Sequence, residues 1–147
     1  MSVSLDDRVA LRDLVEAYAR CADRIDGEGL ASLFVPEGVL RIVRRGVEEE
    51  PVQRTGREEI ATAIKRLDRY VATMHFVGNH YVTVDGDTGT GEAYCVAHHL
   101  VGESGSQIDH VMIIRYQDQY RREADGWKIA VRELRVDWTE ERTVTSP

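Results

Sequence analysis

The stretch His75-Phe-Val-Gly-Asn-His-Tyr-Val-Thr-Val84 begins a region in which the sequence pattern has a period of two. This period is typical of β-strands, whose successive side chains point to opposite faces of a sheet. Three hairpin turn signals divide the region: Asp85-Gly86, Gly102-Glu-Ser-Gly105 and Asp125-Gly126. The pattern therefore predicts a strongly curved antiparallel meander of four long strands, over residues 75–84, 88–101, 108–122 and 127–138.

The region before these strands carries three helical patterns. From Asp6 or Asp7, both suitable N-caps, apolar residues recur at the spacing of an amphipathic helix as far as Ile25: Leu11, Leu14, Val15, Tyr18, Ala22 and Ile25. Residues 30–34 predict a short second helix ended by Pro36. The segment Thr55-Gly-Arg-Glu58 matches a capping box and predicts a third helix over about residues 56–71. Segments 39–43 and 47–53 indicate a short hairpin or two separate strands.

Helices followed by a long curved sheet predict one α+β domain over residues 1–147. The N-terminal helices are expected to pack on the concave face of a mostly antiparallel sheet. The result is a cone-shaped α+β barrel that encloses a cavity, and a cavity of this kind is the default place for a small molecule.

Charge and cysteine content narrow the classes of function. The formal net charge of -7 argues against nucleic acid or an anionic membrane as a partner, because both require concentrated Lys and Arg. The cluster Arg41, Arg44 and Arg45 is followed at once by Glu48, Glu49 and Glu50, which predicts a solvated hairpin. Cys21 and Cys95 have no ligand spacing and indicate buried thiols in a reducing compartment. With no leader and no spanning segment in this sequence, a cytoplasmic location is expected.

An acid and a histidine far apart in the chain are candidates for proton transfer. Asp23 lies in the last turn of the first predicted helix, where a carboxylate opposes the helix dipole and needs a donor as partner. His75 is a natural partner, because an acid bound to one ring nitrogen orients the ring for proton transfer at the other. Alternatively, Asp23 is a solvated acid paired with Arg20 or Arg24, Asp26 takes the functional role, or His75 is a satisfied core histidine.

Period two also indicates which strand residues line the cavity. On the second long strand a face of small side chains leaves room for a ligand: Ala93, Cys95, Ala97 and His99. His98 and His99 cannot both point inward, so a metal site is not expected, and His99 is preferred as the inward residue. On the third long strand Met112 and Tyr116 share a face, and the Tyr116 hydroxyl is a candidate to bind a substrate oxygen.

Arg132 lies between Ala130 and Leu134 on one face of the last strand. An arginine among apolar neighbours needs an anionic partner. This partner is either a developing negative charge on a substrate or, on the outside of the sheet, Glu92 or Asp118.

The order of elements, together with Tyr18-Ala-Arg-Cys-Ala-Asp23, Thr73-Met-His-Phe-Val-Gly-Asn79 and Tyr120-Arg-Arg-Glu-Ala-Asp-Gly-Trp-Lys-Ile129, resembles the SnoaL-like branch of the nuclear transport factor 2-like superfamily. The resemblance covers about residues 5–138. By similarity to hexachlorocyclohexane dehydrochlorinases it implies that Asp23, His75 and Arg132 act together. Bile acid 7α-dehydratases and scytalone dehydratases also carry the first-helix Asp and the His, and scytalone dehydratases have a second cavity His where His98 or His99 falls. The dehydratases have a Tyr beside the Asp, whereas this chain offers Tyr18 one turn earlier.

The resemblance and the residues together predict a cofactor-independent lyase, in first place a dehydratase, acting on a hydrophobic or aromatic small molecule. His75 is the expected general base, Asp23 its orienting acid, Tyr18 a hydroxyl donor and Arg132 the clamp for an oxyanion or leaving group. His99, Tyr116, Cys95 and Met112 are expected to contact the substrate. Alternatives are a SnoaL-type polyketide cyclase or isomerase and a non-catalytic binding domain; epoxide hydrolysis requires an Asp-Arg-Asp arrangement that the sequence does not show. The resemblance also implies a homodimer or higher homo-oligomer, because an exposed convex sheet face in this fold often dimerises.

Overall fold

Four long antiparallel strands build most of the sheet, as the period-two pattern predicts. In the computed structural model, which describes residues 3–145, they are β3 (Ala72–Asp85), β4 (Thr88–Glu103), β5 (Ser106–Glu123) and β6 (Gly126–Val144). The hairpin turns lie where the turn signals predict them. Gly86 and Gly105 adopt φ values of 58° and 84°, which residues with a Cβ rarely adopt.

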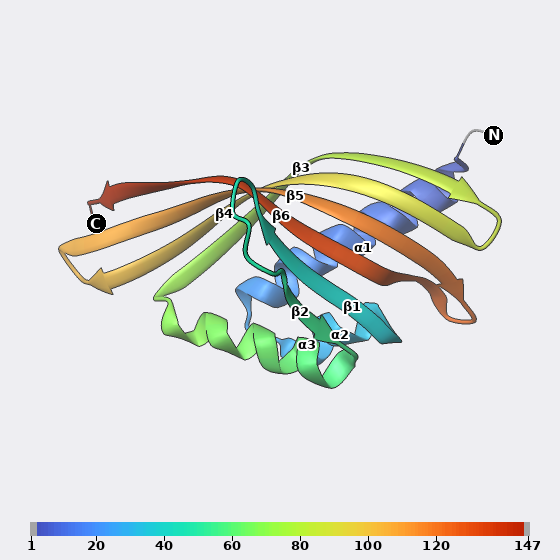
Figure 1. Ribbon diagram of the computed structural model, residues 1–147, viewed down its shortest axis with the longest axis horizontal. Coiled ribbons are helices and arrows are strands. Elements are labelled where there is room, and N and C mark those ends of the chain that lie inside the picture. Colours follow the sequence, from blue (N-terminus) through green and yellow to red (C-terminus); the bar gives the residue numbers. More distant parts are fainter. Residues whose placement is uncertain (1–2, 146–147) are drawn as a thin grey trace.

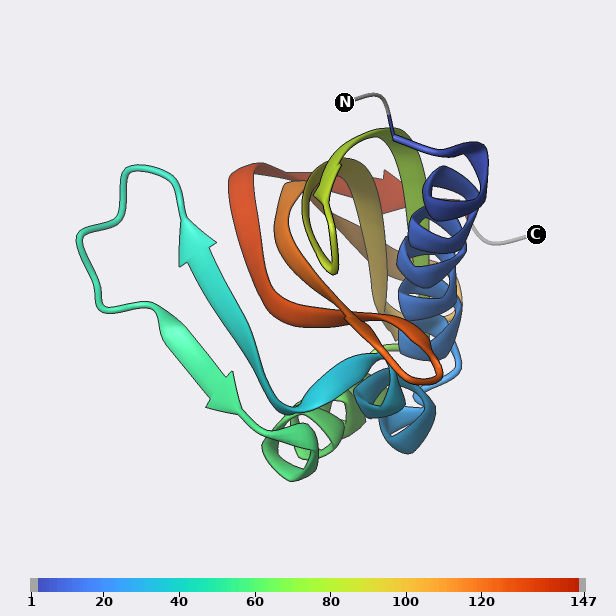
Figure 2. The same cartoon turned by 90° about the vertical axis from the view of Figure 1, so that its right-hand side faces the viewer.

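Two further strands extend the sheet beside β6. β1 (Phe34–Arg44) runs parallel to β6, and β2 (Val52–Thr55) pairs antiparallel with β1 across a loop at 45–51. The strand order is β2-β1-β6-β5-β4-β3, so β2 and β3 form the two edges and the sheet does not close (Figure 1). The expected α+β fold is confirmed: the sheet curls strongly and the helices lie on its concave side (Figure 2).

Helix α1 (Leu5–Asp23) lies along β3 and supplies one side of the core. Its buried side chains are the predicted apolar stripe from Leu11 to Ala22, packed on small and aromatic residues of β4 and β5 such as Ala93, Ala97 and Tyr116. The guanidinium of Arg12 also bonds the Val77 and Gly78 carbonyls, at 3.2 and 2.6 Å, where the β3–β4 register shifts. This bond fixes α1 against β3 at a point where the ladder is interrupted.

The predicted boundaries of the first two helices were wrong in detail. Ser4, not Asp6 or Asp7, is the N-cap of α1, because its hydroxyl accepts from the Asp7 amide at 3.1 Å. Helix α2 (Gly27–Ser32) begins earlier than predicted because Asp26 caps it, with the Gly29 amide 2.8 Å from the carboxylate. Pro36 does not end this helix; it lies in β1 where the pairing with β6 is irregular and no ladder bond is required of it.

The third predicted helix is shorter than the pattern suggests. Helix α3 (Arg57–Ile64) continues only as the 3₁₀ helix η1 (Lys65–Arg69). The capping box was also predicted one residue out of place: Gly56 is the N-cap without a side-chain bond, and Glu59 rather than Glu58 reaches back to the Thr55 amide, at 2.8 Å. The backbone at this cap has a φ of 85°, which glycine adopts without strain because it has no Cβ.

A tight approach between α2 and α3 leads to the first prediction. A Cβ placed on Gly27 would lie 2.5 Å from the Ala61 carbonyl oxygen, which is backbone and cannot move aside alone. We expect Gly27→Ala to lower the free energy of unfolding by about 1–3 kcal/mol, the usual cost of overpacking. Urea denaturation measures this, with Glu28→Ala on the exposed side of the same helix as control. Equal stability of the two variants would contradict the prediction and show that α2 and α3 can move apart to accommodate the added methyl group at no cost in stability.

Candidate active site

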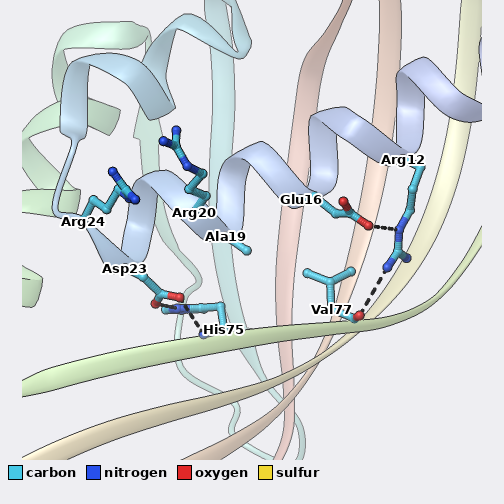
Figure 3. A pocket seen from close by; sticks show the side chains of 8 residues that line it. All are labelled: Arg12, Glu16, Ala19, Arg20, Asp23, Arg24, His75 and Val77. Atoms are coloured by element: carbon cyan, nitrogen blue, oxygen red, sulfur yellow. Dashed lines mark hydrogen bonds and ion pairs between the residues drawn. The ribbon is translucent and has the colours of Figure 1, made fainter.

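Asp23 and His75 lie in direct contact where the end of α1 crosses β3 (Figure 3). Nδ1 of His75 is 2.7 Å from Oδ1 of Asp23, and the Thr73 hydroxyl donates to the same oxygen at 2.9 Å. The other oxygen, Oδ2, accepts the backbone amide of His75 at 3.0 Å. Both carboxylate oxygens are therefore held by β3, and the alternative partners Arg20 and Arg24 point away from the pair.

These bonds set the protonation of the pair. Burial acts to raise the pKa of Asp23, but the hydrogen bonds from the His75 ring, the His75 amide and Thr73 together outweigh it and lower the pKa. Because the carboxylate is ionised at neutral pH, it can only accept, and Nδ1 of His75 must carry the proton. Nε2 is then the ring nitrogen that is placed to accept a proton as a base.

The His75 ring separates two hollows of different character. On one side, an open groove of about 450 Å³ between α1 and β3 exposes part of Asp23 and is bordered by Arg12, Glu16 and Arg20 (Figure 3). On the other, a cavity of about 350 Å³ lies inside the curled sheet. Its wall includes His75 but not Asp23. The acid thus stands behind the histidine, which is the only one of the two to face the cavity.

The inner cavity is mostly apolar. Its wall comes from β1, α3, β5 and β6, with Leu40, Ile42, Ile64, Met112, Ile114 and Leu134 among the side chains. Tyr18 lines it from α1, and burial raises the pKa of Tyr18 to about 12, so its hydroxyl stays protonated. Met112 therefore occupies the predicted position at the cavity wall.

His99 is the inward member of the adjacent histidines. Its side chain is buried, lines the cavity, and lies edge-on to His75 with 5.6 Å between ring centroids. Burial, together with the nearby His75, lowers the pKa of His99, and Nδ1 lies 3.1 Å from the His110 carbonyl. His98 points to the other face, where Nδ1 is 2.6 Å from Asp109.

Arg132 does not reach the cavity, contrary to the expected role as a substrate clamp. Its side chain is completely buried, and Nε and Nη2 donate to the two carboxylate oxygens of Asp118 at 2.8 and 2.7 Å. The guanidinium lies between the rings of Tyr18 and Tyr116, 4.1 Å from each centroid. The reason is positional: Asp118 lies opposite Arg132 in the β5–β6 register, and Tyr18 of α1 packs on the guanidinium.

This arrangement also bears on epoxide hydrolysis. Within residues 3–145 Asp118 is the one carboxylate that contacts Arg132, so no Asp-Arg-Asp arrangement forms there. Asp118 instead accepts a bond from the Tyr120 hydroxyl at 2.6 Å, and His80 lies 3.2 Å from that hydroxyl. The buried arginine therefore belongs to an internal polar network and not to the cavity.

Two other predicted contact residues lie behind the cavity wall. Tyr116 is fully buried and packs on Arg132, and its hydroxyl has no hydrogen-bond partner among residues 3–145. Cys95 is buried next to it, and this burial raises the pKa of the thiol to about 11. Neither residue borders the cavity, whereas Tyr18 and Ile114 do.

Sequence reasoning missed Tyr70 and Thr73. Tyr70 lines the cavity, and its ring centroid is 4.9 Å from that of His99. No local signal marks it, because it follows η1 at a point where a helix was predicted to continue. Thr73 lies two residues before His75 on β3, so the period of two puts both side chains on one face. This spacing could have predicted that Thr73 also bonds Asp23.

The fold and the site define a small α+β domain with an internal apolar cavity. A model of the SnoaL-like domain family matches residues 3–133, so the chain belongs to the SnoaL-like family, within the nuclear transport factor 2-like superfamily. The structure is similar to that of a nuclear transport factor 2-like protein with a cystatin-like fold from Novosphingobium aromaticivorans, with 30% identity, 90% of this chain and 82% of the other covered, and a TM-score of 0.72.

Two further solved structures share the fold at lower identity. A candidate scytalone dehydratase from Novosphingobium aromaticivorans is 21% identical, with 97% and 91% of the two chains covered and a TM-score of 0.78. A hexachlorocyclohexane dehydrochlorinase is 18% identical, with 97% and 94% covered and a TM-score of 0.78. A comparison with curated proteins found no match. Between residues 3 and 145, no helix is both long and apolar enough to cross a membrane.

Proposed function

We propose that the protein is a cofactor-independent lyase that eliminates water from a hydrophobic or aromatic small molecule, with His75 as the base. The observation that carries the proposal is the Asp23–His75 bond of 2.7 Å behind a ring that faces an apolar cavity. An imidazole held in this way presents a basic Nε2 to the ligand and is stabilised by Asp23 once it is protonated. Membership of the SnoaL-like family supports an enzyme of this kind.

In the proposed reaction His75 alone carries the proton, first as a base and then as an acid. Nε2 of His75 takes a proton from a carbon of the substrate, and the electron pair of that C–H bond forms a double bond to the neighbouring carbon. The hydroxyl on that carbon leaves and takes the proton back from the imidazolium, which yields water and the neutral ring. Tyr18 holds the leaving oxygen by donating a hydrogen bond, since its hydroxyl stays protonated.

The contact between His99 and His75 favours a second candidate, isomerisation or cyclisation. His99 is neutral at pH 7 because its pKa is lowered, and it borders the same cavity 5.6 Å from His75. Proton return to a different carbon near His99 gives an isomer and releases no water. The mass of the product therefore separates the two candidates.

The test is a screen of hydroxylated and elimination-prone aromatic and alicyclic compounds, run in D₂O and read by mass spectrometry. A dehydratase gives a product lighter by one water, whereas an isomerase gives an unchanged formula with deuterium at the receiving carbon. We expect the first result, for at least one compound that binds the cavity. If compounds bind the protein and none is converted or exchanges hydrogen for deuterium, the protein is a binding domain and the proposal fails.

A further inference from the structure

Four arginines stand at the rim of the inner cavity. Arg44 is at the end of β1, Arg54 is on β2, and Arg66 and Arg69 are on η1. β1 and β2 lie on the side of the curled sheet away from α1 (Figure 2), and α3, which continues into η1, packs against both strands. The rim is therefore cationic although acids outnumber bases in the chain, 26 to 19.

The rim arginines differ in their partners from the described arginines of β5 and β6, each of which pairs with a carboxylate. Arg115, Arg121 and Arg122, for example, each pair with two carboxylates. Within residues 3–145 no rim arginine pairs with a carboxylate: Arg54 donates to the Gln53 carbonyl and Arg69 to the Tyr70 hydroxyl. In a chain with a surplus of carboxylates, guanidinium groups without one are available to an anion from solution.

Two carboxylates also reach this rim. Glu49 and Glu50 border the cavity from the exposed loop at 45–51, and neither bonds a rim arginine. Four positive charges against two negative charges leave the rim positive. The expected compensation of the arginines by Glu48, Glu49 and Glu50 is thus partial at the cavity.

A stack of rings connects the rim to the proton-transfer pair. The Arg69 guanidinium lies over the Tyr70 ring, 4.8 Å from its centroid, and the Tyr70 ring contacts His99, which contacts His75. A ligand that touches both His75 and the rim therefore lies along one wall of the cavity. Its body is among apolar side chains and its outer end is among guanidinium groups.

We infer that the substrate is an amphipathic anion, with an apolar body in the cavity and a carboxylate, sulfate, sulfonate or phosphate group at the rim formed by Arg44, Arg54, Arg66 and Arg69. This inference rests on the proposed function, since it takes the cavity as the substrate site. Arginine is suited to the task because its planar donors match an oxyanion with two bonds at once. A neutral substrate would leave this group of charges without a use.

The test uses two dyes that share one apolar body. 8-Anilino-1-naphthalenesulfonate carries a sulfonate, and N-phenyl-1-naphthylamine is the same molecule without it. Fluorescence titration is performed on the wild type, on Arg44→Gln/Arg66→Gln, and on the control Arg24→Gln/Arg45→Gln, which removes the same charge outside the inner cavity. We expect the rim variant to bind the sulfonate dye about tenfold more weakly than the wild type, because it loses two exposed ion pairs that each contribute a few-fold in affinity. Its affinity for the neutral dye should be unchanged.

Salt provides a second measurement on the wild type. Raising NaCl from about 0.02 to about 0.5 M shortens the screening length severalfold. We therefore expect the affinity for the sulfonate dye to fall and the affinity for the neutral dye to stay the same. The inference is overturned if the rim and control variants change sulfonate binding equally. It is also overturned if the rim variant loses both dyes, because the arginines then support the fold. Dye binding does not involve proton transfer, so a screen that finds no turnover does not affect the result of the dye titration. Likewise, a failed dye titration does not exclude a lyase that acts on a neutral substrate.

Discussion

His75→Ala is expected to lower kcat on any compound found by the screen by at least about a thousandfold, within the range for loss of a positioned base. Among residues 3–145, the imidazole of His75 is the one basic group that both borders the cavity and is oriented by an ionised acid. The measurement is steady-state turnover, with dye binding as the check that the cavity is intact. His98→Ala is the matched control, because that side chain lies on the opposite face of the sheet and should keep wild-type turnover. Wild-type activity in His75→Ala would transfer the base role to His99 or remove it altogether.

Asp23→Asn tests the orienting role within the same pair. The two oxygens of Asp23 accept from three donors, so an amide in either orientation faces at least one of them with its own N–H groups. One orientation forces the proton of His75 onto Nε2, and the other sets the amide against the backbone N–H. We expect kcat to fall by about 100- to 10,000-fold, as when a triad histidine takes the wrong tautomer. The exposed Glu141, which pairs with His110, provides the control Glu141→Gln. Equal turnover in both variants would remove Asp23 from the mechanism.

Arg132→Met is expected to lower the free energy of unfolding by about 3–5 kcal/mol, the cost of breaking a buried ion pair from one side. The substitution leaves the Asp118 carboxylate buried without a counter-charge and removes the cation between the rings of Tyr18 and Tyr116. Urea denaturation measures the loss. Arg135→Met is the control, because its ion pair with Glu133 is exposed and should contribute about 0–1 kcal/mol.

The double variant Arg132→Met/Asp118→Leu separates the cost of the orphaned charge from the value of the pair. Replacing both partners by apolar side chains should recover most of the loss, since no buried charge then lacks a partner. If Arg132→Met is instead as stable as the wild type and only turnover falls, the arginine serves the substrate directly, as the sequence comparison implied.

Local signals account for the parts of the fold that were predicted correctly. The turns at Asp85-Gly86 and Asp125-Gly126 and the alternation between them depend on neighbouring residues, so the ends of the four long strands were predicted to within about three residues, with one exception. The last strand was predicted to end at 138, and β6 continues to Val144 because it stays paired with β5. The same alternation predicted that His98 and His99 lie on opposite faces. The ends of α1, α2 and α3 were less certain because Ser4, Asp26 and Gly56 compete with equally good caps nearby.

The sequence by itself determined which face of each strand a side chain occupies, and it indicated a need for a donor at Asp23. Only the tertiary structure decided what lies over that face. Arg132 and His99 both point inward, but α1 covers the first with Tyr18 and leaves the second beside open space. The distinction between core and cavity depends on the packing of a helix more than a hundred residues before Arg132, and period and spacing carry no information about contacts of that range.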